Sequence, residues 1–352
     1  MTYRVAVWGT GNVGRFALRA AIHHPALEVA AVWVHSASKV GVDAGVLAGL
    51  EDAVGVTATN DADAILADSE LDCVIYCATA EVRLPAAAKD LSRILESGKN
   101  VVACSPVTLV HPRNMGDAIA NSLEAACVAG KASLFISGID PGYANDLLPL
   151  TLTGVSERID VLRMREIINY ATYNQPETVF NVMGFGKPLD AKPLLLNKGM
   201  LRLAWGGTLR LVAEELGVEL EEVREVHERV AADFRIETTG GVIEPGTTAG
   251  LRFEVQGIVG GEPRIIVEHV TRMHDDVAPH WPQGHGYSII VDGSPNLRLD
   301  LTMEDEHGDT AVAGVILTAT RIVNCVPAVC DAEPGPLTPM DLPHVTGRGL
   351  MR

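Results

Sequence analysis

The amino-acid sequence predicts an α/β fold, in which a doubly wound parallel sheet is followed by a second α+β domain built on a mixed or antiparallel sheet. Three observations carry this prediction. A short apolar run from residue 3 enters a glycine-rich turn that opens a helix. Strand candidates and helical stretches then alternate as far as residue 137, with connections of a few residues. After residues 138–142 the pattern changes to strands with antiparallel character.

The glycine-rich turn has the form G-x-G-x-x-G, and each glycine has its own task. Gly9 makes the tight turn, Gly11 lets the backbone approach a pyrophosphate, and Gly14 lets the helix pack on the strand. The helix N-terminus offers N–H groups and a partial positive charge to phosphates. An ordinary glycine-rich turn is the alternative, but the position between a strand and a helix favours dinucleotide binding by a Rossmann domain. The predicted cofactor-binding residues are Gly9, Thr10, Gly11, Asn12, Val13 and Gly14.

The end of the second predicted strand, residues 27–34, indicates which dinucleotide binds. In an NAD-preferring site this strand end carries Asp or Glu, which accepts hydrogen bonds from the ribose 2′-hydroxyl. This chain has no acid there and offers Ser36, Ser38 and Lys39. Two hydroxyls and a cation suit the 2′-phosphate of NADP. Lys39 could also be a solvated loop residue, so the sequence favours NADP and leaves NAD possible.

The rest of the first domain continues the alternation of strands and helices. Further strands are expected near residues 54–57, 72–76, 100–104 and 132–137. Small residues at the carboxyl end of a parallel strand let a cofactor lie across it. The residues predicted to do so are Ala78, Thr79 and Cys104.

The second domain is expected to hold the substrate and the dimer contacts. Its predicted helices cover residues 143–153, 201–216 and 220–232, and its strands 158–170, 234–238, 251–259, 264–273, 287–291 and 297–303. A helix over 309–326 and a proline-rich tail are predicted to return to the first domain. The expected organisation is therefore 1–150 for the NAD(P)-binding domain, 151–304 for the second domain, and 305–352 packed back on the first.

Composition restricts the partners and the compartment. The chain of 352 residues is 47% hydrophobic and 21% charged, which is typical of a globular protein with two cores. A net charge of -17 argues against nucleic acid or an anionic membrane, because both attract basic patches. The sequence shows no membrane-length apolar run and no signal peptide, and its six cysteines lack C-x-x-C spacing. These features predict buried free thiols in a cytoplasmic enzyme with a small-molecule substrate.

Several motifs in one order resemble a known family. They are Gly9-Thr10-Gly11-Asn12-Val13-Gly14, residues 98–102, Pro141-Gly142-Tyr143 continuing to residue 151, residues 183–188, residues 278–282 and residues 319–328. The chain resembles the dihydrodipicolinate reductase-like Rossmann oxidoreductases, and within them the 2,4-diaminopentanoate dehydrogenases and native amine dehydrogenases. The resemblance implies an NAD(P)H-dependent homodimer with a substrate pocket between its domains. Members of the family interconvert a ketone plus ammonia with an amine.

Two departures from the family pattern bear on the reaction. True dihydrodipicolinate reductases carry a paired-histidine motif in the second domain, whereas His23-His24 of this chain lies in the first, so lysine biosynthesis is not expected. The resemblance also implies a glutamate just after the fifth strand that handles the amine proton. Residues 103–112 contain no acid. The sequence therefore predicts that carbonyl or imine reduction exceeds ammonia-dependent turnover.

Hydride transfer needs a proton donor for the developing alkoxide or amine. The candidate catalytic residues are Tyr143, Tyr173 and Glu166, and the candidate substrate-binding residues are Tyr170 and Asn169. Each tyrosine could instead be a wall aromatic whose hydroxyl is satisfied. The histidines at 269, 274, 280 and 285 fit no known metal spacing, so no metal is expected.

Three functions remain open from the sequence. The first is an NADP-dependent oxidoreductase acting on a small carbonyl, imine or amine by hydride transfer from nicotinamide C4. The second is a true amine dehydrogenase whose acid comes from another position, such as Glu166. The third is a non-catalytic NADP-binding sensor. The acid-free segment 103–112 is the feature that separates the first two.

Overall fold

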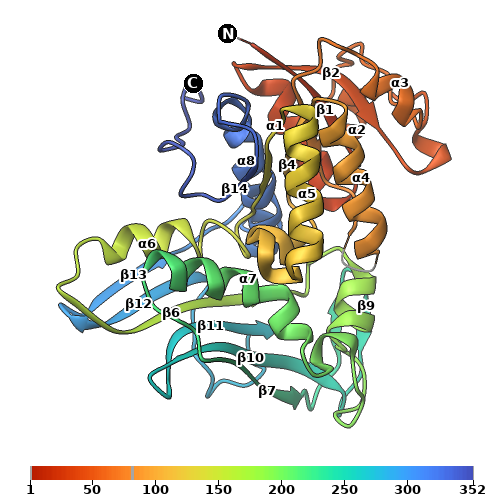
Figure 1. Cartoon of the computed structure of the whole chain (residues 1–352). Helices are drawn as coiled ribbons and strands as arrows, with labels where there is room; N and C mark the ends of the chain where they lie inside the picture. Colours follow the sequence, from red (N-terminus) through yellow and green to blue (C-terminus); the bar gives the residue numbers. More distant parts are fainter. Residues whose placement is uncertain (1, 81–82, 352) are drawn as a thin grey trace. The chain divides into compact units, whose positions relative to one another are not determined.

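The computed structural model describes residues 2–80 and 83–351, and the chain divides into two compact units (Figure 1). The first unit combines Met1–Asp140 with Val315–Arg352, and the second is Pro141–Gly314. The sequence placed the first boundary at 150 and the return at 305. In the structure the chain enters the second unit at Pro141 and leaves it at Gly314, inside the helix Thr310–Cys330, where no loop marks the boundary.

The first unit is built on a six-stranded sheet whose strands all run parallel. Its order is β14-β5-β4-β3-β1-β2. Successive strands are therefore added on one side of β1 first and then, from β3 onward, on its other side. The strands are β1 Tyr3–Trp8, β2 Leu27–Trp33, β3 Cys73–Tyr76, β4 Asn100–Ala103, β5 Leu134–Ile136 and β14 Pro336–Leu337. This arrangement confirms the predicted doubly wound sheet.

Two details of this sheet differ from the expectation. The strand predicted over 54–57 is reduced to isolated bridges, of which Thr59 with Trp33 is parallel and Thr57 with Asp43 is antiparallel. Gly55, at φ 81°, lies inside the predicted run and breaks its extended course. The sixth strand instead comes from the tail, where β14 pairs with β5. Pro336 can join because an edge position needs few N–H donors.

Helices cover the strands of the first unit. They are α1 Asn12–His23, α2 Ala44–Ala48, α3 Ala62–Leu66, α4 Leu84–Glu96 and α5 Asp117–Gly130, with short 3-10 turns η1 Ala37–Lys39, η2 Val107–Val110 and η3 Pro112–Met115. Buried residues of α4 and α5, such as Leu91 and Leu123, form one apolar core with β3, β4 and β5. The two helices approach closely, since a Cβ on Gly130 would lie 1.8 Å from the carbonyl oxygen of Leu95.

The expectation that no apolar run reaches membrane length is wrong for one helix: α8, Thr310–Cys330, has the length and hydropathy of a membrane span, with 44% of its most apolar window buried. Its contacts within the first unit are those of a core helix. The Arg321 guanidinium lies over the Phe135 ring at 5.6 Å, and Thr318 accepts a hydrogen bond from the backbone of Ile139. Just beyond the helix, Asp331 accepts a 2.7 Å hydrogen bond from the hydroxyl of Tyr3. The residue that follows α8 is thus hydrogen-bonded to the first residue of β1.

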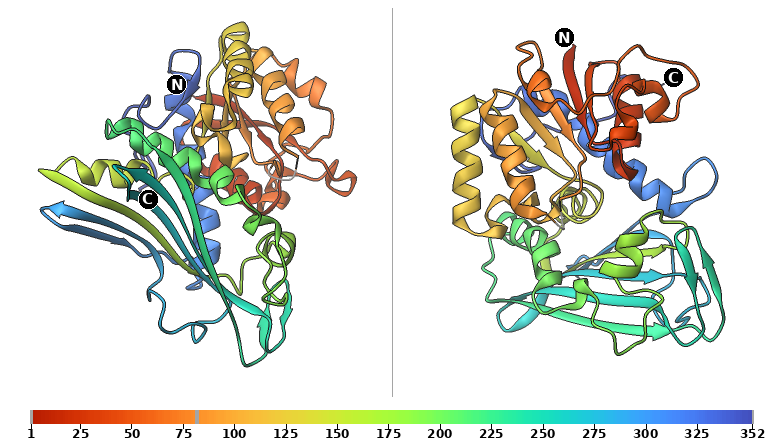
Figure 2. Two further views of the ribbon diagram at one scale, coloured as in Figure 1. Left: turned by 60° about the horizontal axis from the view of Figure 1, so that its bottom comes forward. Right: turned by 90° about the vertical axis from the view of Figure 1, so that its right-hand side faces the viewer.

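The second unit is built on a broad twisted sheet (Figure 2). The sheet is mixed and has six strands in the order β13-β12-β6-β11-β10-β7. Its strands are β6 Arg158–Asn169, β7 Glu222–Ala231, β10 Thr248–Val259, β11 Glu262–Arg272, β12 Gly286–Ser294 and β13 Leu297–Leu301; β8 Ile236–Thr238 and β9 Gly241–Ile243 form a separate pair. Only β6 and β11 pair in parallel. The predicted α+β domain is confirmed.

One predicted helix of this unit is a strand. The stretch 220–232 has valines at helical spacing, at 223, 226 and 230, and yet Glu222–Ala231 forms β7 and pairs with β10 along its length. β-Branched valines favour a strand, and pairing with β10 overrides the weak helical periodicity. The many charges of this stretch suit its place at the edge of the sheet.

The two faces of the large sheet have opposite character. Helix α7, Met200–Glu215, packs on β10, β11 and β7, and its Leu209 shares an apolar core with Leu162 and Met164 of β6; the shorter α6 is Leu147–Thr153. Arg163 and Arg165 alternate with those core residues and therefore point to the other face. That face carries the ionic network described next.

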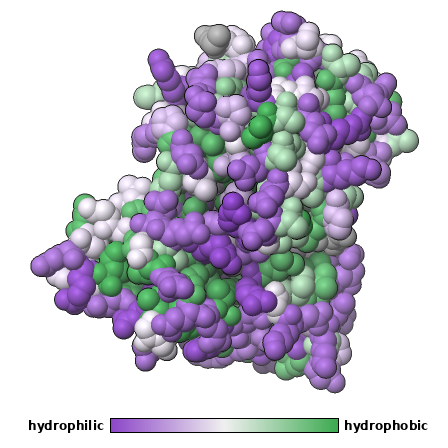
Figure 3. Space-filling view, in the orientation of Figure 1, coloured by the Kyte–Doolittle hydropathy of each residue, from purple (hydrophilic) through white to green (hydrophobic). Residues whose placement is uncertain are grey.

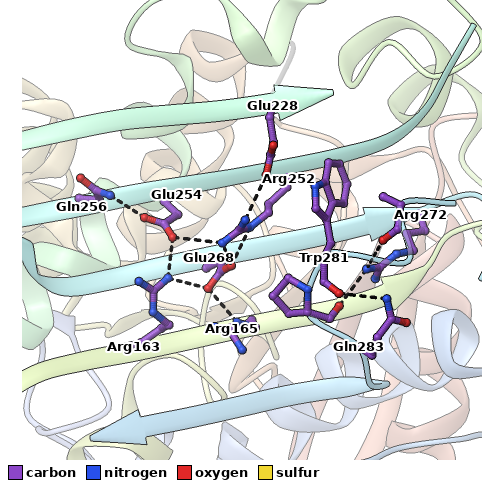
Figure 4. A network of polar contacts seen from close by, with 12 residues as sticks. Arg163, Arg165, Glu228, Arg252, Glu254, Gln256, Glu268, Arg272, Trp281 and Gln283 are labelled. Atoms are coloured by element: carbon purple, nitrogen blue, oxygen red, sulfur yellow. Dashed lines mark hydrogen bonds and ion pairs between the residues drawn. The ribbon is translucent and has the colours of Figure 1, made fainter. Parts of the chain in front are cut away.

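Glu268 is the centre of this network and is fully buried. Its carboxylate accepts hydrogen bonds from Arg163 at 2.6 Å, Arg165 at 2.7 Å and Arg252 at 2.9 Å (Figure 4). Burial alone would raise the pKa of Glu268, but the hydrogen bond from Arg165 and the charges of Arg163 and Arg165 outweigh it and hold the pKa below its usual value. Removal of this carboxylate would leave three arginines without their shared partner, a change that is usually strongly destabilising.

Candidate cofactor site and acid–base cluster

The turn between β1 and α1 is shaped by its glycines. Gly9 has φ 96°, and a Cβ there would lie 3.1 Å from the backbone nitrogen of Ala78. A Cβ on Gly14 would lie 1.9 Å from the carbonyl oxygen of Gly9, so only glycine lets the helix approach the turn. A Cβ on Gly11 meets nothing within 4 Å. Gly9 and Gly14 are therefore packed tightly against neighbouring protein atoms, whereas the space beside Gly11 is open to a ligand.

The first turn of α1 is suited to an anion. Its N-cap, Gly11, contributes no side-chain hydrogen bond, and no acidic residue occupies the first turn. The N–H groups there are not capped by the helix's own side chains, and the helix dipole favours negative charge. Asn12 and Val13 form the start of this turn, as predicted for pyrophosphate binding.

The residues predicted to meet a 2′-phosphate gather beside this turn. Lys39, at the end of η1, donates from Nζ to the carbonyl oxygen of Thr10 at 2.7 Å and to its hydroxyl at 3.2 Å. The hydroxyls of Ser36 and Ser38 are exposed and lie 2.9 Å apart. One ammonium group and two hydroxyls thus stand next to the glycine turn.

The carboxyl ends of β3 and β4 complete the first-unit site. Ala78 lies against Gly9, and the carbonyl oxygen of Thr79 accepts a 2.6 Å hydrogen bond from Arg83. The backbone of Cys104 donates to Tyr76 at 3.2 Å, which continues the pairing of the two strands. The predicted cofactor residues therefore lie at the edge of the sheet where the strand order reverses.

The acid-free segment after β4 folds into two short turns. Thr108 is buried, and its hydroxyl and carbonyl oxygens both accept hydrogen bonds from the Asn114 side chain. The Nδ1 atom of His111 accepts a hydrogen bond from the backbone of Arg113. This segment offers hydroxyls and an imidazole, and no carboxylate.

The second unit holds a buried carboxylate that accepts several hydrogen bonds. Glu166 of β6 is 4% exposed. Its Oε2 accepts a hydrogen bond from Tyr287 at 2.9 Å, and its Oε1 one from Tyr170 at 3.1 Å. The Nδ1 atom of His269 lies 3.2 Å from the same Oε1. Two hydroxyl donors and one imidazole nitrogen therefore surround the carboxylate of Glu166.

Strand register brings these residues together. In the parallel pairing of β6 with β11, Glu166 lies opposite His269, and in the antiparallel pairing with β12 it lies opposite Tyr287. Tyr170 follows β6, on the same face as Glu166 because the two are four residues apart. We call Glu166, Tyr170, His269 and Tyr287 the acid–base cluster.

Aromatic rings surround the cluster. The His269 ring stacks on Phe253 with centroids 4.6 Å apart and an interplanar angle of 11°, and it meets the edge of Trp205 at 4.6 Å. The Tyr173 ring lies 4.8 Å from that of Tyr170. The stacking with Phe253 and the contact with Trp205 restrict the plane of the imidazole ring.

The other two predicted site residues of this unit are Tyr143 and Asn169. Tyr143 is half-buried in the turn before α6, on a different element from the cluster. Asn169 is an odd number of residues from Glu166 on β6 and points to the opposite face. There its amide donates to Asp275 at 2.9 Å, and it lines a pocket of about 100 Å³ with Arg272, Gln283 and His285. Tyr170 and Asn169 therefore do not share one binding surface.

Sequence reasoning missed His269 and Tyr287. Both were visible as residue types, but more than 100 positions separate each of them from Glu166 along the chain. Their meeting depends on the pairing of β6 with β11 and β12, which no local pattern encodes. The other histidines singled out, at 274, 280 and 285, lie exposed on the connection between β11 and β12.

Comparison with known proteins identifies the family. A family model described as the 2,4-diaminopentanoate dehydrogenase C-terminal domain matches residues 143–351, and one described as the dihydrodipicolinate reductase N-terminus matches residues 3–105. A curated amine dehydrogenase from Streptomyces virginiae is 43% identical over 343 residues, which cover 96% of this chain and 95% of that protein. The chain belongs to the 2,4-diaminopentanoate dehydrogenase and amine dehydrogenase family.

More distant relatives agree with this assignment. The 2,4-diaminopentanoate dehydrogenase of Acetoanaerobium sticklandii is 23% identical over 282 residues, covering 79% of this chain and 76% of that protein. The structure of the amine dehydrogenase from Mycobacterium smegmatis has the same fold, with a TM-score of 0.79, 21% identity, and coverage of 98% of this chain and 97% of that one. Membership of the dehydrogenase family confirms the predicted resemblance and the prediction of an oxidoreductase enzyme with a nicotinamide cofactor.

Proposed function

We propose that this dehydrogenase is an NADP-dependent amine dehydrogenase, which transfers a hydride between nicotinamide C4 and the carbon that bears a small primary amine. The observation that carries the proposal is the acid–base cluster, a buried carboxylate with a histidine and two tyrosines around it. Identity of 43% to a curated amine dehydrogenase supports the amine as substrate. The nicotinamide supplies and accepts the hydride, and the chain supplies binding, orientation and proton handling.

The cluster is suited to moving a proton. Loss of hydride from the α-carbon leaves an iminium ion, and the nitrogen must shed a proton before or during this step so that its lone pair is available. If Nδ1–H of His269 donates to Glu166, the Nε2 atom becomes the accepting atom of the imidazole. The Glu166 carboxylate then stabilises the imidazolium formed when Nε2 takes a proton. Glu166 acts through His269 in this scheme.

The two tyrosines complete the arrangement. Tyr287 and Tyr170 donate to Glu166 and fix the carboxylate, so that it faces His269 in one geometry. In the direction of amine synthesis, the same imidazole would release protons to the carbinolamine as water leaves. We propose Tyr170, with Tyr173 and Tyr143, as the aromatic groups that contact the substrate, because all three are half-buried.

A second candidate is a carbonyl or imine reductase. The observation that favours it is the segment 103–112, which offers the first-unit site no carboxylate. Ketone reduction needs hydride delivery and one hydrogen-bond donor, which a tyrosine can supply. NADPH consumption with a panel of small ketones, with and without ammonium at about pH 9, where part of the ammonium is neutral, separates the two. Ammonia-dependent turnover with amine product supports the dehydrogenase, whereas alcohol formed equally well without ammonium supports the reductase. NADPH binding without turnover of any substrate would instead support a sensor.

We propose NADP as the cofactor because Lys39, Ser36 and Ser38 stand beside the phosphate-binding turn. Charge-assisted hydrogen bonds contribute about 1.5–3 kcal/mol. Lys39→Ala should therefore weaken NADPH binding roughly tenfold or more and leave NADH binding little changed. Titration of cofactor fluorescence measures both affinities. An equal loss for the two cofactors would show that Lys39 supports the Thr10 turn and does not bind a 2′-phosphate.

We propose that the protein works as a cytoplasmic homodimer and binds neither nucleic acid nor membrane. Support comes from the family resemblance, the net charge of -17, and hydrophobic areas among charged residues on the surface of the second unit (Figure 3). Exposed apolar residues of this unit are Val155, Leu189, Leu194, Val218 and Val226. Light scattering at micromolar concentration should give about twice the mass of the chain. A single-chain mass would contradict the dimer.

A further inference from the structure

Two cysteines stand side by side at the cofactor edge of the first unit. Tyr76 of β3 pairs with Ala103 of β4, and the next residue of each strand is a cysteine, Cys77 and Cys104. Both are half-buried free thiols. Their side chains are in hydrogen-bond contact. The Sγ atom of Cys104 also lies 3.9 Å from the carbonyl oxygen of Tyr76.

Their geometry fits a disulfide without movement of the strands. Neighbouring strands lie roughly 4.8 Å apart. Disulfide-bonded cysteines have Cα atoms about 4.4–6.8 Å apart, so partners in register across two strands are within range. Cys77 and Cys104 occupy equivalent positions after paired residues, and their side chains are on one face of the sheet.

The pair is coupled to the phosphate-binding turn. A Cβ on Gly14 would lie 3.2 Å from the Cβ of Cys77, and a Cβ on Gly9 would lie 3.2 Å from the carbonyl carbon of Cys77. The first helix and its turn therefore rest directly on Cys77. A change in the position of its sulfur would be transmitted to the turn that holds the cofactor phosphates.

The two sulfurs are placed for different roles. The hydrogen bond to Cys104, and after it burial, raise the pKa of the Cys77 thiol well above its usual value. A thiol whose pKa is raised is the poorer nucleophile, because less of it is present as thiolate. The first attack on an oxidant falls to Cys104, and Cys77 is the thiol that resolves the product.

We propose that Cys77 and Cys104 are a reversible oxidation site for peroxides, which lowers cofactor affinity when the disulfide forms. The Cys104 thiolate attacks one oxygen of hydrogen peroxide, the O–O bond breaks, and the departing hydroxide takes up a proton to leave as water, giving a sulfenic acid. The sulfur of Cys77 then attacks the sulfur of Cys104, the S–O bond breaks, and a second water leaves with the thiol proton. Two thiols lose two electrons and two protons, and the peroxide is reduced to two waters.

Cofactor binding and oxidation should oppose each other. If the disulfide form binds the cofactor less well, then bound cofactor must make oxidation less favourable by the same factor. The device would make the empty enzyme sensitive to peroxide and protect the enzyme that is loaded with cofactor.

A second pair of cysteines, Cys73 and Cys330, serves as a control for the oxidation of Cys77 and Cys104. Cys73, at the start of β3, is fully buried, and its thiol is in hydrogen-bond contact with that of Cys330 at the end of α8. Burial, followed by this contact, raises the pKa of Cys73. Since Cys73 has no exposed surface, this pair should oxidise after Cys77 and Cys104, and only as the protein opens.

The experiment treats the reduced full-length protein with graded hydrogen peroxide, with and without NADP+. Alkylation of the remaining thiols and mass mapping of peptides then locate the disulfide. We expect a Cys77–Cys104 crosslink that dithiothreitol reverses, a dissociation constant for NADP+ at least tenfold higher in the oxidised protein, and slower oxidation when NADP+ is present. Over-oxidation of Cys104 without a crosslink, earlier crosslinking of Cys73 with Cys330, or a crosslink that leaves NADP+ affinity unchanged would each overturn the proposal.

Two variants sharpen this test. In Cys77→Ser the resolving thiol is absent, so peroxide should leave a sulfenic acid on Cys104 that dimedone traps, with no crosslink. Cys330→Ser removes one thiol of the control pair and should keep the full peroxide response. A Cys330→Ser protein that has lost the response would contradict the assignment. The mapping of the unmodified chain needs no variant and decides the question even if a substitution prevents folding.

Discussion

Replacing Glu166 by Gln is expected to lower kcat by about 10²–10⁴-fold, the usual effect of removing a group on which general acid–base catalysis depends. The amide keeps the size of the side chain but cannot stabilise an imidazolium at His269, which lies 3.2 Å away. NADPH affinity should change little, because the cofactor residues belong to the first unit. Steady-state kinetics with the best amine, together with cofactor titration, measures both quantities.

The matched control for this prediction is Glu237→Gln, which removes the same charge from an exposed carboxylate of the same unit. Its kcat should stay near that of the unmodified enzyme. Equal turnover in Glu166→Gln and the control would mean that the buried carboxylate only ties β6 to β11 and β12.

Glu268→Gln should destabilise the protein by about 3–5 kcal/mol, because three guanidinium groups lose the buried carboxylate that they share. The control is Glu228→Gln, a half-exposed carboxylate with a 3.1 Å contact to Arg252, for which roughly 1 kcal/mol or less is expected. Urea unfolding followed by fluorescence compares the two. If Glu268→Gln lowers the free energy of unfolding no more than the control does, the ionic network does not stabilise the protein.

The effect of Glu268 should also depend on pH. Its pKa is lower in the folded protein than its usual value, so its contribution to stability is complete above the unfolded pKa and is lost as pH falls through the folded one. The stability difference between the unmodified protein and Glu268→Gln should therefore shrink below about pH 4. A difference that stays constant over the acidic range would point to packing as its origin.

The sequence predicted those parts of the molecule that local patterns determine. Gly9, Gly11 and Gly14 marked the phosphate-binding turn because their roles are set within six residues. The preference for NADP is likewise predicted from a few neighbouring residues, because no Asp or Glu stands near Ser36 and Lys39. The helix predicted over 220–232 is wrong, because the local pattern cannot show that a neighbouring strand is available for pairing with residues 222–231.

The acid–base cluster was predicted in part, for the same reason. Glu166 and Tyr170 lie four residues apart and were both noted as site candidates. His269 and Tyr287 join them only through strand register, which depends on the whole sheet. The separation of Asn169 from Tyr170 onto opposite faces follows from the alternation of a strand, once its start and register are known.

The small strand Pro336–Leu337 has a consequence for how the protein is made. It adds the last strand to a sheet that begins at residue 3, and Asp331 binds Tyr3 a few residues before it. During synthesis the first part of the N-terminal unit emerges early but lacks its edge strand until residues 336–337 have left the ribosome. The second unit is an insertion that can complete its sheet earlier, since all its strands lie between residues 158 and 301. Translation thus reverses the order in which the two units become complete, and the nucleotide-binding one is finished last.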